Sequence, residues 1–134
     1  MYSLENYQEK DQQVIEVSKQ LKYFDVFYKI TIHNVCLEAN EKDCWYKAKD
    51  GKVYKLSFIK YFENKYFLYS NSLVNLWDIP DYPINSKEVS AFHSDGILNK
   101  QLESIELGSM ELKMNVISSE EGSMFLFAIS HSFH

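Results

Sequence analysis

Two stretches in which apolar and polar residues alternate flank an Asp50-Gly51 dipeptide near the middle of the chain. Alternation with a period of two is the pattern of a β-strand with one buried face, and Asp-Gly favours a two-residue hairpin loop. Such a loop pairs Trp45 with Leu56 and places both side chains on one face of the sheet. We therefore predict a β-hairpin formed by residues 44–49 and 52–62.

The last third of the chain predicts two further antiparallel connections. Gly108-Ser109 suits a two-residue type II′ turn between the strands on either side of it. Residues 119–122 suit a four-residue loop that pairs Val116 with Phe125. Because both registers gather the apolar residues of these strands on one face, we predict a three-stranded meander in which Phe125 is buried.

The N-terminal region predicts a helix over residues 4–22, because Ser3 can cap it, Glu5 and Glu9 lie near its start, and Lys19 and Lys22 lie near its end. From residue 25 the period becomes two, which predicts one long strand over residues 25–38. A further strand over residues 66–79 ends where two prolines begin a loop. The expected fold is one α+β domain, residues 1–134: an antiparallel β-sheet of about six strands with the N-terminal helix packed on one face.

The charge of the chain limits its partners. All 14 basic residues are lysine, whereas 19 residues are acidic, and the net charge is −5. Arginine is the usual reader of phosphates and of guanine edges, and phosphate attraction supplies most non-specific affinity for nucleic acids. We therefore expect no direct binding to nucleic acid. An acidic protein suits a basic protein partner, whose approach it steers.

The two cysteines, Cys36 and Cys44, match no redox or zinc motif. Residues 1–6 lack the basic start and apolar run of a signal peptide, and no apolar stretch is long enough to span a membrane. We therefore expect a cytoplasmic protein with reduced, structural thiols and no contact with a membrane.

Histidines and cysteines are the candidates for chemistry. A metal site built from His93, Asp95, His131 and His134 is disfavoured, because residues three apart on a strand point to opposite faces. The same objection applies to a nucleophilic pair of Cys36 with His33, and the four glycines of the chain form no phosphate loop or nucleophile elbow. We predict no catalytic residue, no metal and no cofactor.

Acidic and aromatic residues concentrate in two segments, and two interpretations of them stay open. Clustered carboxylates either form a docking surface or simply keep the protein soluble. Tyrosine and tryptophan are enriched at protein interfaces because they combine a large apolar area with a polar tip. If the segments bind a partner, the contact residues are Glu38, Glu41, Asp43, Tyr46, Trp77, Asp78, Asp81 and Tyr82.

The C-terminal half carries a resemblance to a known class of proteins. Trp77, the Phe92–Ile97 segment and the alternating segments Ile105–Leu107 and Met110–Met114 resemble a pattern of the small acidic immunity proteins of bacterial polymorphic toxin systems, including contact-dependent growth inhibition. The resemblance implies a protein that binds one toxin domain, often a basic nuclease, and blocks its active site or substrate surface. It implies no catalytic residues.

The leading hypothesis is therefore an immunity protein, not an enzyme, that neutralises a cognate toxin domain by tight stoichiometric binding in the cytoplasm. One alternative is a small-molecule-binding or enzymatic domain with a pocket between helix and sheet, lined by tyrosines and His93. Another is an oligomeric structural or phage-encoded protein.

Overall fold

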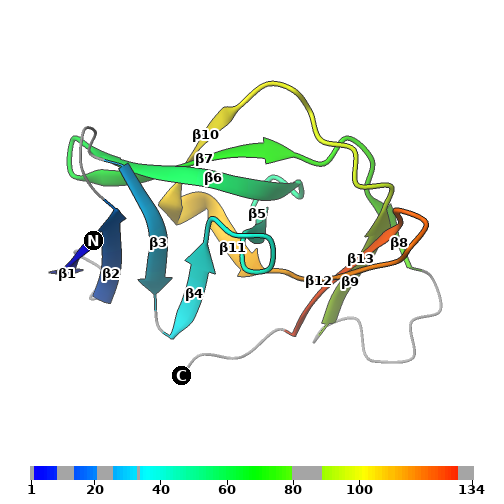
Figure 1. Ribbon diagram of the computed structural model, residues 1–134, viewed down its shortest axis with the longest axis horizontal. Coiled ribbons are helices and arrows are strands. Elements are labelled where there is room, and N and C mark those ends of the chain that lie inside the picture. Colours follow the sequence, from blue (N-terminus) through cyan, green and yellow to red (C-terminus); the bar gives the residue numbers. More distant parts are fainter. Residues whose placement is uncertain (1, 9–13, 21–25, 33, 80–88, 130–134) are drawn as a thin grey trace.

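The computed structural model describes residues 2–8, 14–20, 26–32, 34–79 and 89–129, and it shows two antiparallel β-sheets (Figure 1). In this part of the chain the larger sheet contains β1 (Tyr2–Gln8), β2 (Val14–Gln20), β3 (Val26–Ile32), β4 (Val35–Glu38), β5 (Trp45–Ala48), β6 (Val53–Phe62), β7 (Lys65–Ser72), β10 (Glu103–Glu106) and β11 (Met110–Lys113). The smaller sheet contains β8 (Trp77–Asp78), β9 (Val89–Ser94), β12 (Asn115–Ser118) and β13 (Met124–Ile129). A short 3₁₀ turn, η1 (Leu107–Ser109), separates β10 from β11.

The predicted N-terminal helix is wrong, and with it the α+β class. The structure places β1 and β2 there as an antiparallel pair, with Tyr2 opposite Gln20 and Gln8 opposite Val14, and β2 continues the pairing to β3. No α-helix occurs among the residues that the structure describes. The β-branched residues of β2 favour a strand, and a neighbouring strand stabilises them more than a weakly apolar helical stripe would.

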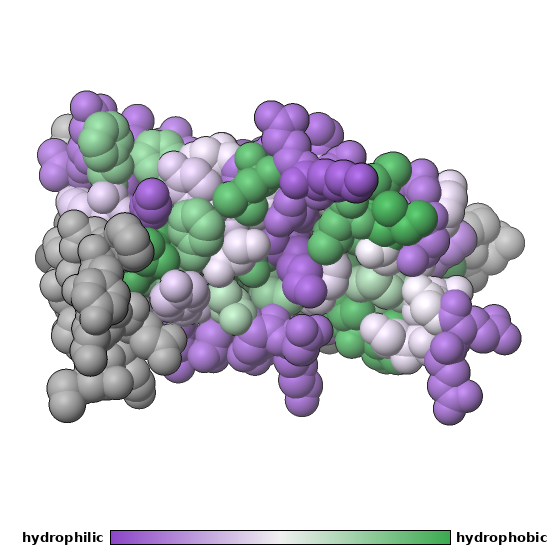
Figure 2. Space-filling model, turned by 45° about the horizontal axis from the view of Figure 1, so that its top comes forward, coloured by the Kyte–Doolittle hydropathy of each residue, from purple (hydrophilic) through white to green (hydrophobic). Residues whose placement is uncertain are grey.

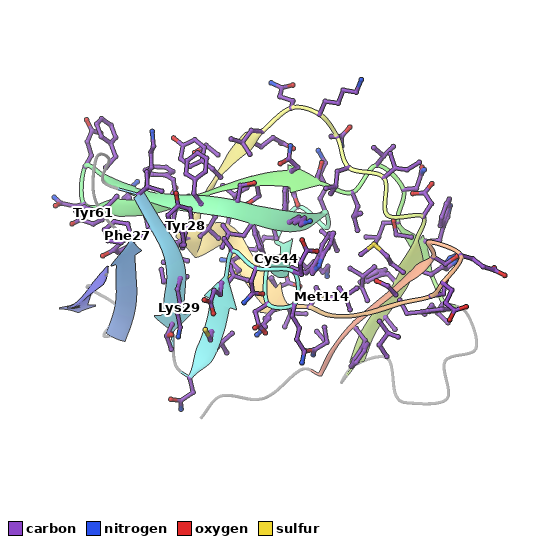
Figure 3. All side chains as sticks on the ribbon, viewed as in Figure 1. Phe27, Tyr28, Lys29, Cys44, Tyr61 and Met114 are labelled. Atoms are coloured by element: carbon purple, nitrogen blue, oxygen red, sulfur yellow. The ribbon has the colours of Figure 1, made fainter. Side chains whose placement is uncertain are left out.

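The long strand predicted over residues 25–38 is divided into β3 and β4 by a tight turn. Ile32 pairs with Val35, and Asn34 has a φ of 68°. Within β3, Tyr28 is an extra residue in the pairing with β2 and forms a β-bulge. The bulge interrupts the alternation, so Phe27 and Ile30 are both buried, whereas Tyr28 is exposed (Figure 3).

The central hairpin exists, but its register differs from the prediction by one residue. Trp45 pairs with Lys55 instead of Leu56, because residues 49–51 form a three-residue loop. The Gly51 N–H donates to the Ala48 carbonyl (3.0 Å), and Gly51 has a φ of +89°. A type I turn followed by a left-handed glycine is the usual geometry of such a loop.

The C-terminal hairpin, β12–β13, shows the same geometry. Val116 pairs with Leu126 instead of Phe125, and Gly122 has a φ of +89° with its N–H directed at the Ser119 carbonyl (3.2 Å). The third predicted hairpin, at Gly108, is wrong. There the chain forms η1, β10 pairs with β7, and β11 pairs with β5.

The larger sheet curls so that two of its edges meet. Hydrogen-bonded neighbours follow the order β10-β7-β6-β5-β11, and in a flat sheet the outer two strands of such a set would lie about 19 Å apart. The segment from Glu106 to Met110 spans at most about 14 Å. The sheet must therefore curve, and it closes around fully buried side chains that include Tyr46, Ile59 and Leu68.

The smaller sheet packs against the larger one through a continuous apolar core. The chain passes from β11 directly into β12 at Met114, which is fully buried and lies between the two sheets (Figure 3). Its N–H donates to the Trp45 carbonyl (2.9 Å). Leu126 of β13 and Val53 of β6 belong to the same cluster of buried residues. These contacts bury one face of the smaller sheet against the core, and the opposite face points away from the larger sheet.

Gly51→Ala should lower the free energy of unfolding by about 1 kcal/mol, because the left-handed conformation strains any side chain with a Cβ. A Cβ at this position would meet no heavy atom within 4 Å, so the cost comes from the backbone alone. Gly108→Ala is the matched control, since its site is equally open and its φ is not positive. Urea unfolding should leave that variant within about 0.5 kcal/mol of the wild type. Equal destabilisation of both variants would contradict the assignment of the loop.

Candidate functional site: the outer face of the smaller sheet

Four side chains form a line across the smaller sheet, one from each strand. Trp77 of β8 pairs with His93 of β9, His93 pairs with Phe125 of β13, and Phe125 pairs with Ile117 of β12. Directly paired residues of an antiparallel sheet point to the same face. We call this line the apolar row.

The apolar row is open to solvent. Trp77 is 45% exposed, Phe125 47% and Ile117 59%, and His93 is half-buried. The ring centroids of Trp77 and His93 lie 5.0 Å apart with an interplanar angle of 32°, so His93 covers one side of the indole. Large aromatic side chains left exposed in a contiguous line are unusual on a protein without a partner.

The alternation of the strands explains why the row is exposed. In β13, Met124, Leu126 and Ala128 are buried in the core, so Phe125 between them points outward. In β9 the same alternation turns Phe92 toward the core and His93 away from it. Apolar side chains reach the surface at the end of the molecule that holds this sheet (Figure 2).

The surroundings of the row are acidic. The smaller sheet and its adjoining turns carry four carboxylates, and no lysine occurs in residues 75–79, 89–97 or 114–129. The carboxylates belong to Asp78, Asp95, Glu120 and Glu121, all exposed. Asp78 pairs with Phe92 and so points to the other face of the sheet, which leaves Asp95, Glu120 and Glu121 as the rim of the row. The site therefore combines an apolar centre with a rim of one charge.

Hydrogen bonds hold part of this rim in place. Asp95 accepts hydrogen bonds from the Asn75 side chain (2.7 Å) and from the Ile97 N–H (3.2 Å). The Ser94 hydroxyl, which is buried, donates to the Asn75 carbonyl (2.5 Å). Gly96 follows with a φ of +79°, and a Cβ there would come within 3.0 Å of the Met124 sulfur. The turn after β9 is thus fixed by its own contacts and by the core.

The structure places the predicted contact residues in different environments. Trp77 belongs to the apolar row, and Asp78, the next residue of β8, is exposed but pairs with Phe92 and so points to the opposite face of the sheet. Tyr46 is fully buried, so its prediction as a contact was wrong: its ring stacks on Tyr54 and its hydroxyl bonds to Ser70 (2.5 Å). Asp81 and Tyr82 lie outside the described residues.

The predicted acidic segment after β4 is an ordered loop on the larger sheet. The Asp43 carboxylate accepts a hydrogen bond from the Lys113 ammonium (2.9 Å), and the Asn40 side chain accepts the Asp43 N–H (2.6 Å). Glu38 is half-buried at the end of β4, and Glu41 is exposed. The bond to Lys113 holds the pKa of Asp43 below its ordinary value, against the opposing effect of burial. Asp43 thus anchors its own loop to β11.

Three members of the apolar row were not among the predicted contacts. The sequence suggests His93 as a metal ligand or as part of a ligand pocket, and no pattern singles out Ile117. Phe125 was expected in the core, because a one-residue error in register exchanges the faces of a strand. The signal that places Ile117 opposite Phe125 is the third-position glycine of the β12–β13 loop, Gly122.

The candidates for chemistry are not brought together. Among the described residues no group of three or more histidines, cysteines and carboxylates can hold a metal. His93 faces Trp77, and Cys44 is fully buried. His33, His131 and His134 lie outside the described residues. The pocket expected between helix and sheet has no helix to form it in the part of the chain that the structure describes. In that part no helix is long and apolar enough to cross a membrane.

Asp43→Asn should lower the free energy of unfolding by about 0.5 kcal/mol at neutral pH, since a partly exposed ion pair contributes little. A carboxyl whose folded pKa is depressed stabilises the fold above its unfolded pKa, about 3.9, and this contribution is lost as pH falls through the folded value. The difference between wild type and variant should be constant from about pH 7 to 5 and shrink below about pH 4. In a Lys113→Met background it should largely disappear, and persistence there would contradict the pairing.

The two thiols should differ in reactivity. Burial raises the pKa of the Cys44 thiol to about 11, so its reactive thiolate is scarce at pH 8. Cys36 is only half-buried on β4. Treatment of the native protein with a maleimide, followed by mass spectrometry, should show rapid modification of Cys36 and slow modification of Cys44. Equal rates in the folded protein, and not only in urea, would contradict the burial of Cys44.

Comparison with known proteins gives one positive finding. No curated protein and no solved structure matches the chain. A family model described as a domain of unknown function, DUF8592, matches residues 8–129, which covers β2 to β13 and so includes the whole apolar row. The chain belongs to this family.

Proposed function

We propose that the protein is a binding protein without enzymatic activity that neutralises a cognate toxin domain in the cytoplasm by forming a stoichiometric complex. The observation that carries this proposal is the apolar row with its acidic rim. The row supplies the contact area and the rim selects a partner with a basic surface.

The composition of the row fits a protein interface. Tryptophan and other aromatic residues dominate the energy of interfaces, and they act near the centre of a contact that excludes water. Full burial of a side chain of the size of Phe125 contributes about 1.5–3 kcal/mol. Phe125 is 47% exposed, so covering the rest of it contributes roughly half of that amount, and Trp77 and Ile117 add similar contributions.

The carboxylates of the rim have a different role. Charges at the edge of an interface raise the association rate of an oppositely charged partner and disfavour other partners. Because no lysine occurs in the described residues of the smaller sheet and its turns, 75–79, 89–97 and 114–129, a basic surface is attracted to this part of the site. Nucleases, which must bind phosphates, carry such surfaces.

The segments that resemble immunity proteins include part of the proposed binding site. Two of the segments that carry it, Trp77 and Phe92–Ile97, form β8, β9 and the turn after them. These segments supply half of the apolar row and one carboxylate of its rim. A toxin domain bound there would lose access to its own basic surface.

Trp77→Ala and Phe125→Ser should each abolish capture of the partner. The measurement is a tagged pull-down from the native cell, read by mass spectrometry, with salt varied in the wash. Wild type should retain a toxin domain, the C-terminal part of a large secreted protein, at one-to-one stoichiometry. Each variant should weaken binding by at least about 30-fold, the loss expected for an aromatic anchor, and high salt should weaken the wild-type complex.

Phe62→Ser is the matched control. Phe62 is an aromatic residue on β6 of the larger sheet and is 63% exposed, more than either row residue. This variant should capture the partner as the wild type does. Loss of binding in Phe62→Ser but not in the row variants would move the interface to the larger sheet, and recovery of no toxin by the wild type would contradict the function itself.

A further inference from the structure

The smaller sheet ends on one side in a strand that lacks the usual protection of an edge. Proteins prevent edge strands from pairing with other chains by charged residues, proline, bulges or very short length. Along β12 the sequence is Asn115-Val116-Ile117-Ser118, without a charge or a proline, and its pairing with β13 is regular. The opposite edge, β8, has only two residues.

The other edge strands of the described chain are protected by charge. In the larger sheet, β1 contains Glu5, β4 contains Glu38, β10 contains Glu103 and Glu106, and β11 contains Glu111 and Lys113. The contrast indicates that the edge of β12 is kept free for pairing. Asn115, Ile117 and Ser118 are exposed, so the edge is accessible.

The ladder shows which backbone groups face outward. The Ser119 N–H bonds to the Ser123 carbonyl (2.8 Å), and hydrogen-bonded pairs of an antiparallel ladder alternate with non-bonded ones. Ile117 therefore bonds with Phe125, whereas the N–H and carbonyl groups of Val116 and Ser118 point away from β13. Among the described residues no strand pairs with these groups, which form the outer edge of the smaller sheet.

We propose that a second copy of this chain occupies this edge, with β12 of both copies paired antiparallel about a two-fold axis at Ile117. In this register Val116 of each copy bonds with Ser118 of the other, which uses all the outward groups. Ile117 lies opposite its own equivalent in a non-bonded pair, on the same face in both copies. The result is one continuous sheet in which two apolar rows meet end to end.

The charges permit this pairing. An antiparallel arrangement puts the two Glu120-Glu121 loops at opposite ends of the joined strands, about 26 Å apart for eight residues of strand. This distance exceeds the screening length of about 8 Å at physiological salt, so their repulsion is weak. At the axis itself the paired strands carry no charge, and two exposed isoleucines become covered. A second copy therefore fits the edge better than a charged segment would.

The test is the molecular mass of the full chain in solution. The protomer has a mass of 15.8 kDa, and a short edge-to-edge contact predicts a dimer that dissociates in the micromolar range. Sedimentation over a series of concentrations should show the mass doubling. Ile117→Lys and Ile117→Glu should each be monomeric, because like charges then meet at the axis. Mixing the two variants should restore the dimer, since the charges become complementary.

A disulfide between the two copies tests the proposed register of the paired β12 strands. In a Cys36→Ser background, Ile117→Cys should form a disulfide-linked dimer on mild oxidation, because the non-bonded pair brings the Cα atoms within the range of a disulfide. Ser118→Cys is the control, since it lies opposite Val116 of the other copy and should not crosslink. A wild type that stays monomeric at all concentrations, a dimer that survives Ile117→Lys, or equal crosslinking at both positions would overturn the proposal.

Discussion

The left-handed glycines at the third position of two hairpin loops set the register on which the rest of the structure depends. Gly51 and Gly122 both have a φ of +89°, and each allows a three-residue loop where a two- or four-residue loop would shift the pairing by one residue. Because the side chains of a strand alternate, such a shift exchanges the buried and exposed faces. One glycine places Tyr46 and Tyr54 inside the larger sheet, and the other places Phe125 on the surface.

The sequence predicts where several strands lie better than which face each buries. The hairpins at Gly51 and Gly122 were predicted in place, but both registers were wrong, because composition alone does not separate loops that differ by one residue. The bulge at Tyr28 and a second one at Ser57 add further shifts, so Leu56 and Ile59 are both buried although three residues apart. Alternation counted across a bulge necessarily fails.

The helix and the site show the limits of local patterns in a different way. Residues 4–22 have charges that suit a helix, yet β3 offers β2 a partner strand, and such tertiary pairing overrides a weak propensity. The sequence predicts Trp77 as a contact because tryptophan is enriched at protein interfaces, and the structure leaves it exposed. The line that it forms with His93, Phe125 and Ile117 depends on long-range pairing, which no local pattern contains.

Charge is distributed unequally between the two sheets. The larger sheet carries ion pairs that stabilise the fold, whereas the smaller sheet carries carboxylates that we propose attract a partner. In the described part of the chain the ion pairs lie on the larger sheet, where Lys47 bonds to Glu111, Lys113 to Asp43 and Lys65 to Glu106. Other lysines there lie over aromatic rings, such as Lys60 over Phe58. The carboxylates of the smaller sheet take part in none of these ion pairs. Their negative charge is therefore not neutralised by these lysines and can act on an approaching partner.

The two proposed contacts share Ile117 but otherwise use different parts of the smaller sheet. A partner on the apolar row covers side chains, whereas a second copy at β12 binds backbone groups in the plane of the sheet. The two-fold axis at Ile117 would bring two apolar rows onto one face of the dimer. A partner that presents two copies of its own surface could then bind both rows, and the first contact would raise the effective concentration for the second. Edge pairing also covers the least protected strand of the sheet, so the same contact that joins the copies removes a site of aggregation.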